Sequence, residues 1–312
     1  MTHRRHLQPL HAAARSLLRR LAQASQDWRA CRPGALSAPQ ASGQVPGWCV
    51  GWASLAGPHH ANQDCAGATW HHRPGRGVHA PGWGVHAAVA DGVTHGAAGD
   101  VAAAALARHW LRGPAAGQSQ SDFLAQADRA VAQALAALGP APGAATGAAC
   151  WLGPDGRGTL TRIGDCRALL AQRNACDDGP AAWRVLPVTT DQSYAAQMAQ
   201  MPQYADLPPE QWPAGIDPDQ PACMAGIGRV GTPETFALAL QPGDVLLLCS
   251  DGLHSVLDTA EPQALFDARL PSATAAASAH TLLALAHDLV QTAALRGSDD
   301  DITALLLARC GG

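Results

Sequence analysis

The stretch ATGAACWLGPDGRGTLTRI, residues 145–163, contains two apolar runs joined by a short polar segment. The GPDG segment at 153–156 strongly favours a chain reversal, because glycine accepts positive φ and proline presets a turn. The flanking residues predict strands over 145–152 and 159–163 that pair as an antiparallel hairpin. The sequence therefore predicts an antiparallel sheet around this hairpin.

Further apolar runs on both sides of the hairpin predict the other secondary structure. Strands are expected at 49–55, 85–90, 168–171, 235–240, 245–249 and 302–308, and helices at 99–111, 121–138 and 273–295. The helices fall between groups of strands and do not alternate with single strands. This order favours a mixed α+β layered domain over a parallel doubly wound sheet.

The N-terminal part of the chain differs in character from the rest. Residues 7–21 carry leucines at helical spacing among arginines, which predicts an amphipathic helix that packs on its own domain or binds a partner or a membrane surface. Residues 32–46, rich in Pro, Gly, Ser and Ala, predict a linker. We therefore expect an N-terminal helix and linker over 1–46 and a main domain over 47–312, with an irregular Pro- and Gln-rich flap at about 192–229.

Composition excludes several classes of function. The net charge of −4 and pI of about 6.4 argue against a basic nucleic-acid-binding surface. All 21 basic residues are arginine, which excludes Schiff-base chemistry and a Walker-type phosphate loop. The nine cysteines include no C-x-x-C pair, so neither a disulfide framework nor a thiolate zinc site is expected. With no signal peptide and no long apolar run, we expect a soluble, cytoplasmic protein without a transmembrane segment.

Aspartates recur at the ends of apolar runs. Asp91 follows HAAVA, Asp251 follows VLLLCS, Asp300 precedes ITALLL, and Asp64 ends ANQD. Strand ends hold side chains rigidly beside a cleft, and oxygen ligands favour Mg²⁺ or Mn²⁺. Converging carboxylates need such cations, and a pair of them activates water for attack on phosphorus. Each aspartate taken alone is more typical of a turn, a solvated loop or a helix cap than of a catalytic site.

Six motifs occur in an order that resembles the metal-dependent protein phosphatases of the PPM, or type 2C, class, bacterial type. They are NQDC (62–65), VADGVTHG (89–96), GDCRALL (164–170), VTTDQS (188–193), LLLCSDGLHSVL (246–257) and SDDDITALLL (298–307). The resemblance implies a four-layer α/β/β/α sandwich, with a central antiparallel β-sandwich flanked by helices. It also implies two divalent metal ions, Mn²⁺ or Mg²⁺, and a third, weaker ion.

The resemblance assigns metal ligands to this chain. Asp91 would bridge both ions with help from the Gly92 carbonyl, and Asp251 and Asp300 would complete the first ion's shell. Asp64 would reach the second ion through water.

Two further positions match the family less decisively. Asp165 either helps to bind the third ion or simply forms a hairpin turn beside Arg167. Thr146 matches a buried threonine that fixes a carboxylate by hydrogen bonding.

Four positions depart from the family pattern. His59 stands where an arginine usually clamps the substrate phosphate, which makes it a catalytic candidate with weaker or more pH-dependent phosphate binding. Gln63 replaces a glutamate, and Gln192 replaces a histidine that often acts as a general acid. Asp301 replaces an asparagine, so it competes with Asp300 as ligand. His95 is a candidate to supply a proton instead.

The leading hypothesis is a serine/threonine protein phosphatase that hydrolyses phosphoserine and phosphothreonine through a two-metal activated water. Its substrate would be a Ser/Thr kinase or the targets of that kinase, and we expect a monomer. The alternative is a catalytically impaired relative that binds a phosphoprotein or kinase partner as a regulator. A third hypothesis gives the N-terminal helix a docking role that sets location.

Overall fold

The computed structural model describes residues 40–310, apart from 46, 74–81, 94–97, 116, 140–141, 175–181, 229, 232–233 and 271–276. The predicted N-terminal helix over 7–21 and the candidate proton donor His95 lie outside the described residues.

Two antiparallel sheets form the centre of the molecule. The larger has six strands in the order β1-β2-β11-β10-β7-β8, and the smaller has five in the order β3-β4-β5-β6-β9. The six are β1 (Gln40–Val45), β2 (Trp48–Leu55), β11 (Ile302–Arg309), β10 (Val245–Cys249), β7 (Arg167–Asn174) and β8 (Ala182–Pro187). The five are β3 (Cys65–Arg73), β4 (Gly82–Gly92), β5 (Ala145–Leu152), β6 (Arg157–Ile163) and β9 (Thr235–Ala239).

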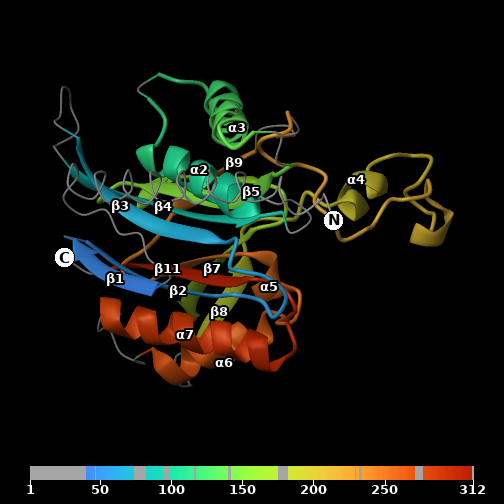
Figure 1. Cartoon of the computed structure of the whole chain (residues 1–312). Helices are drawn as coiled ribbons and strands as arrows, with labels where there is room; N and C mark the ends of the chain where they lie inside the picture. The colour runs from blue at the N-terminus through green and yellow to red at the C-terminus, as the bar shows by residue number, and fades with distance from the viewer. Residues whose placement is uncertain are drawn as a thin grey trace, which may run out of the picture.

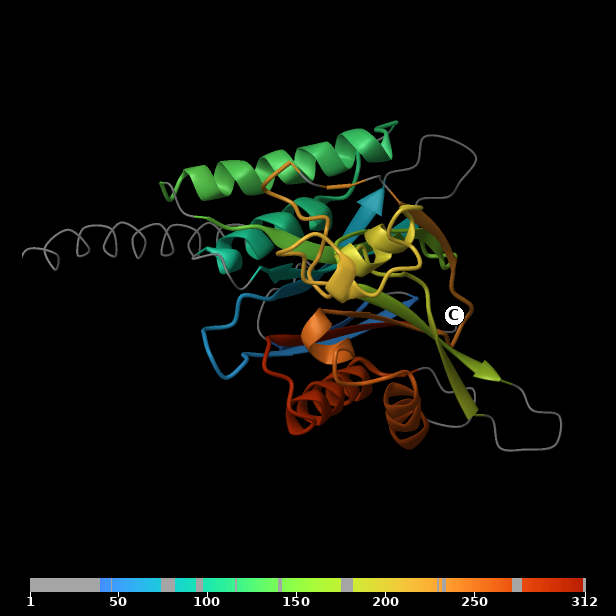
Figure 2. The same ribbon diagram turned by 90° about the vertical axis from the view of Figure 1, so that its right-hand side faces the viewer.

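Helices cover the outer face of each sheet. Figures 1 and 2 show α2 and α3 over the five-stranded sheet, and α6 and α7 over the six-stranded sheet. The helices are α2 (Gly99–Arg112), α3 (Gln120–Ala136), α4 (Tyr194–Ala199), α5 (Asp251–His254), α6 (Ala260–Arg269) and α7 (Ala279–Leu295), with a 3₁₀ turn η1 (Pro209–Gln211). The predicted four-layer α/β/β/α sandwich is confirmed.

Alternation along the strands separates the three apolar layers. In β2, Trp48, Val50 and Trp52 face the layer between the sheets, whereas Cys49 and Ala53 face α7. Leucines of β10 and β11 alternate in the same way, as the period of two in a strand requires. Trp48 and Trp52 are completely buried, and truncating either to Ala is expected to cost about 3–5 kcal/mol.

The central hairpin forms as predicted. Strands β5 and β6 pair from Leu152↔Gly158 to Gly147↔Ile163, and the turn between them places Gly156 at φ +81°. Only glycine accepts that backbone conformation without strain, which explains why the turn ends there.

The structure corrects two sequence predictions. Part of the linker predicted over 32–46 is a strand, since Gln40–Val45 pairs with β2 along its whole length. Helix α7 begins at Ala279 and not at Ala273, because the Ser278 hydroxyl accepts a hydrogen bond from the Thr281 N–H and caps the helix. The flap is mostly irregular, as predicted, but it contains α4 and η1.

Candidate metal centre

Four of the predicted aspartates line one cavity of about 730 Å³, together with His59, His60 and Thr146. Asp91 lies near the end of β4, Asp165 in the turn between β6 and β7, Asp251 at the start of α5 after β10, and Asp300 just before β11. The cavity therefore lies where strands of both sheets end. Figure 1 shows α4 of the flap projecting from the end of the sheets at which α5 lies.

A close backbone contact explains why glycine follows each of two site aspartates. A β-carbon on Gly92 would lie 2.3 Å from the backbone of Gly99, and one on Gly252 would lie 2.1 Å from the Asp301 carbonyl oxygen. Neither contact is possible for a larger residue without movement of the backbone. The Asp-Gly pairs are therefore close-packing positions that bring α2 and the start of β11 against the site.

Asp91 and Asp251 form the centre of the acidic cluster. Their carboxyl groups lie close together and act on each other's pKa, although Asp91 comes from the five-stranded sheet and Asp251 follows a strand of the six-stranded sheet. Burial, followed by repulsion from Asp251 and Asp64, raises the pKa of Asp91 well above its ordinary value. Burial, followed by repulsion from Asp300, raises the pKa of Asp251 to about 6. Without a cation, the two carboxyl groups hold a proton between them.

Asp64 lies behind the cavity and does not line it. The Ser250 hydroxyl donates a 2.7 Å hydrogen bond to its Oδ2, and burial raises the pKa of Asp64 to about 8. Repulsion from Asp301 and Asp251 adds to that effect. This position agrees with the expected indirect role of Asp64 through water, which stays a prediction.

Asp165 is buried, with 4% of its surface exposed, in the turn before β7. Burial and repulsion from Asp251 raise the pKa of Asp165 to about 7, while a hydrogen bond with Thr146 lowers it. Thr146 is also the cross-strand partner of Asp91 in the sheet register, so it neighbours both aspartates. Arg167 forms no ion pair with Asp165, since its guanidinium binds both oxygens of Asp191 at 2.7 and 2.6 Å.

Three buried carboxylate oxygens in and behind the cavity are unsatisfied among the described residues. The Oδ1 atoms of Asp64, Asp165 and Asp251 are buried and have no hydrogen-bond partner within the described part of the chain. A buried carboxylate oxygen without a donor is costly, and a hard divalent cation satisfies several such oxygens at once. Carboxylate oxygens of this kind suit a hard divalent cation.

The adjacent Asp300 and Asp301 have different surroundings. Asp301 is 2% exposed, and its two oxygens accept the backbone N–H groups of Gly57 at 2.8 Å and Gln63 at 2.6 Å. Asp300 lines the cavity instead. One ligand atom each from His60, Asp300 and Asp301 lie within 4.8 Å of one another. Because both Asp301 oxygens are already used by the backbone, Asp300 is the better placed ligand.

The residues that depart from the family pattern occupy distinct places. His59 is exposed at the cavity, where an incoming phosphate group can reach it. Gln192 does not line the cavity, because its Oε1 accepts the Gly164 N–H at 2.8 Å and fixes the turn that holds Asp165. The Gln63 side chain lies against Gly99, whose added β-carbon would be 2.8 Å from Gln63 Oε1.

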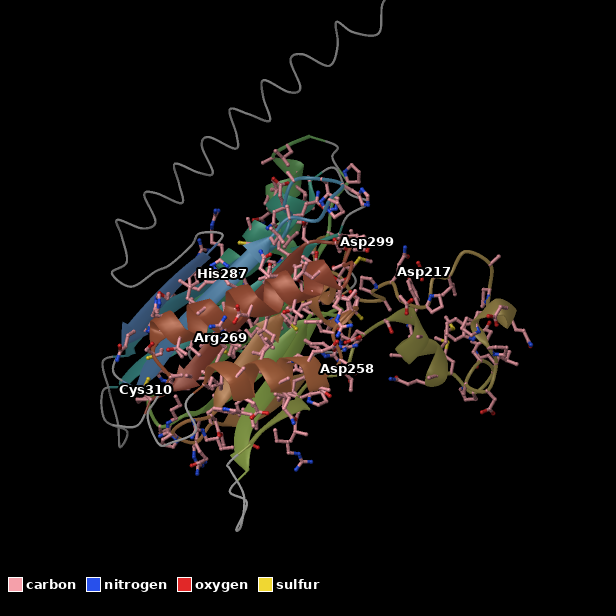
Figure 3. The ribbon with its side chains drawn as sticks, turned by 90° about the horizontal axis from the view of Figure 1, so that it is seen from below. Asp217, Asp258, Arg269, His287, Asp299 and Cys310 are labelled. Carbon is pink, nitrogen blue, oxygen red and sulfur yellow. The ribbon has the colours of Figure 1, made fainter. Side chains whose placement is uncertain are left out.

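No individual flap residue was predicted from the sequence to belong to the site. Asp217, Asp219, Gln220, Pro221 and Met224 all line the cavity, so the flap supplies one of its walls. In Figure 3, Asp217 of the flap and Asp299 of the loop before β11 lie on the same side of the molecule. The only local signal was an Asp-Pro-Asp sequence at 217–219, which is common in turns.

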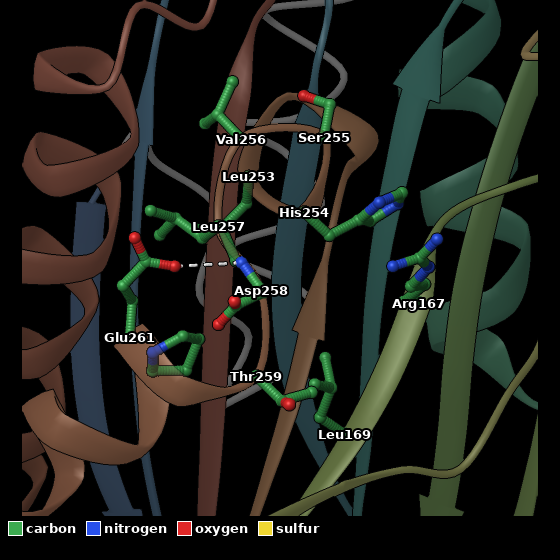
Figure 4. Close-up of a pocket in the computed structure, with 11 residues that line it drawn as sticks. Arg167, Leu169, Leu253, His254, Ser255, Val256, Leu257, Asp258, Thr259 and Glu261 are labelled. Carbon is green, nitrogen blue, oxygen red and sulfur yellow. Dashed lines mark hydrogen bonds between the residues drawn. The ribbon is translucent and has the colours of Figure 1, made fainter.

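A second, smaller cavity of about 410 Å³ lies behind the Asp165 turn, between β7 and the segment that joins α5 to α6. His254 and Arg167 face each other at its rim (Figure 4). The His254 Nε2 atom is 2.9 Å from the Asp165 carbonyl oxygen, and burial lowers the pKa of His254 to about 4. The neutral imidazole therefore donates to this carbonyl and supports the turn from behind.

Comparison with known proteins agrees with this architecture. A family model described as Stage II sporulation protein E (SpoIIE) matches residues 209–309, less than half of the chain. No curated protein sequence matches the chain significantly.

Several solved structures are similar to it. PppA, described as a key regulatory component of T6SS in Pseudomonas aeruginosa, is 22% identical, with a TM-score of 0.56 over 86% of this chain and 100% of PppA. Serine/threonine phosphatase Stp1 from Staphylococcus aureus is 18% identical, with a TM-score of 0.58 over 84% of this chain and 95% of Stp1. The serine/threonine phosphatase PstP/Ppp of Mycobacterium tuberculosis is 21% identical, with a TM-score of 0.57 over 85% and 99%.

Two antiparallel sheets enclosed by helices, with aspartates gathered where their strands end, define the class of protein. The chain has the fold of the bacterial PPM Ser/Thr phosphatases, as its six motifs predicted.

Proposed function

We propose that the chain is a metal-dependent serine/threonine protein phosphatase. The observation that supports this most strongly is the set of buried, unsatisfied carboxylate oxygens near the Asp91–Asp251 pair. Asp91, Asp251 and Asp300 would hold the first cation, and Asp91 with the Gly92 carbonyl would hold the second. Asp64 would act through water, and Asp165 would hold a weaker third ion. Mn²⁺ or Mg²⁺ held there would supply an activated water for attack on phosphorus.

The chain's own residues would bind and orient the substrate. A phosphate group entering the cavity would meet His59 at its exposed edge, where the imidazole can donate a hydrogen bond. Asp217 and Asp219 of the flap would border the peptide on the other side. Thr146 and Ser250 would fix the rotamers of Asp165 and Asp64 through their hydroxyl groups.

Cell location and partners are part of the same proposal. No helix in the described residues is long and apolar enough to cross a membrane. We propose a cytoplasmic protein that acts on a Ser/Thr kinase or on the targets of that kinase.

A regulatory protein without turnover is the second candidate. The replacement of a phosphate-clamping arginine by His59 favours it, and so does the likeness to PppA, which is described as a regulatory component. Under this hypothesis the same cavity binds a phosphoprotein without hydrolysing it.

Phosphate release from p-nitrophenyl phosphate and from a phosphothreonine peptide separates the two candidates. The phosphatase hypothesis predicts Mn²⁺-dependent release that EDTA abolishes and that Asp91→Asn lowers to background. Asp206→Asn is the matched control, because Asp206 is an exposed flap residue that does not line the cavity. Full activity in EDTA, or no turnover of either substrate above the Asp91→Asn background, would reject it.

A further inference from the structure

Two cysteines lie in contact at the edge of the apolar layer under α7. Cys49 is the second residue of β2, Cys310 directly follows β11, and their Sγ atoms are 3.0 Å apart. The strands fix this approach, because Cys49 pairs with Ala308 and the Cys310 N–H donates to the Gly47 carbonyl oxygen at 2.9 Å. Both side chains point to the same face of the sheet, toward α7.

The separation is close to that of a bonded pair. Sulfur atoms in a disulfide are about 2.05 Å apart, so bond formation needs a movement of about 1 Å. Cys310 is partly exposed, whereas Cys150, Cys166 and Cys249 are completely buried. Among the cysteines with described surroundings, this pair therefore combines contact between two thiols with access from solvent.

We propose that Cys49 and Cys310 are an oxidation site, at which a peroxide converts the two thiols into a reversible disulfide. One thiolate attacks a peroxide oxygen, an S–O bond forms, and the O–O bond breaks with release of water after proton transfer. The second thiol then attacks this sulfenic sulfur, the S–S bond forms, and a second water leaves with the remaining proton. The pair loses two electrons and the peroxide gains them.

The local electrostatics support a reactive thiolate. The hydrogen bond from Cys310 lowers the pKa of Cys49 against the opposing effect of burial. A backbone hydrogen bond from Ala279, the first residue of α7, lowers it further. The thiolate is the nucleophile in cysteine oxidation, and a helix N-terminus stabilises it.

The bond would join the two ends of the described domain. It would close a loop from the beginning of β2 to the end of β11, and long closed loops restrict the unfolded chain most. Cys310 lies at the end of the molecule away from Asp217 and Asp299 (Figure 3). Oxidation should therefore raise thermal stability without changing phosphate release, and the proposal is independent of the proposed function.

Mass spectrometry of the full chain tests the proposal. The reduced protein is treated with hydrogen peroxide, remaining thiols are alkylated after unfolding, and the protein is digested without reductant. We expect a linked peptide pair containing Cys49 and Cys310 that dithiothreitol separates. Cys223→Ser, a control at another partly buried thiol, should keep the link.

Thermal unfolding provides a second readout. Oxidised wild-type protein should melt at a higher temperature than reduced protein, and Cys310→Ser should abolish both the difference and the linked peptides. Separate alkylation of Cys49 and Cys310 after peroxide treatment, or their conversion to sulfinic acid without a link, would overturn the proposal.

Discussion

Asp91 and Asp251 bring their carboxyl groups together across the gap between the two sheets, and each shifts the pKa of the other. Two carboxyl groups this close repel each other unless they share a proton or a cation. A cation between the sheets would replace the shared proton. Occupancy of the site should therefore be linked to pH and to the stability of the whole sandwich.

Metal removal should destabilise the chain more as the pH rises. Burial raises the pKa of Asp64 to about 8, of Asp165 to about 7 and of Asp251 to about 6. Aspartates of the unfolded chain titrate at about pH 4, so the folded metal-free protein binds more protons between about pH 4 and 8. Its stability is greatest below that range and falls as pH rises through these pKa values.

Thermal unfolding in EDTA and in Mn²⁺ measures this effect. The difference in melting temperature between the two conditions should be larger at about pH 8 than at about pH 5.5. The Asp206→Asn control should behave like wild type. A stabilisation by Mn²⁺ that does not change with pH would contradict the linkage.

Asp301 should be a structural residue and not a ligand. Asp301→Ala removes both acceptors of the Gly57 and Gln63 N–H groups, which should cost about 2–4 kcal/mol and loosen the loop that carries His59. Asp299→Ala, at an exposed neighbour, should change stability by less than about 0.5 kcal/mol. Urea unfolding of the two variants compares them, and equal stabilities would show that Asp301 does not hold this loop.

His59→Arg should strengthen substrate binding. A guanidinium supplies a permanent charge and two parallel donors to a phosphate, whereas an imidazole supplies one donor. The KM for a phosphopeptide should fall about threefold to tenfold, with kcat little changed. His280→Arg, at an exposed position on α7, adds the same charge outside the cavity and should leave KM unchanged. A KM that responds equally to both variants would point to overall charge and not to a phosphate contact.

Strand ends were predictable because their signals are local. The apolar runs before Asp91 and Asp251 and the turn at Gly156 each depend on a few neighbouring residues, and the structure places all of them as expected. Strand β1 was not predictable, since QASGQV has little apolar character and depends on pairing with β2. The start of α7 was predicted too early, at Ala273, because the prediction did not take account of the Ser278 cap that sets the boundary.

Positions that depend on tertiary contacts were harder to predict. Asp300 and Asp301 are adjacent in sequence, and only the hydrogen bonds from Gly57 and Gln63 distinguish them. The flap residues Asp217 and Asp219 reach the cavity across a long irregular segment that has no periodic pattern. Family resemblance identified Asp165 and Thr146 without showing that Arg167 pairs with Asp191.

Calorimetric titration of Mn²⁺ into the metal-free full chain tests the central claim most directly. Wild type and Asp206→Asn should bind at least two cations, Asp64→Asn should lose only one of them, and Asp91→Asn should lose both. These outcomes follow if Asp91 is shared between the ions. Retention of wild-type stoichiometry and affinity by Asp91→Asn would contradict a metal centre built around this residue.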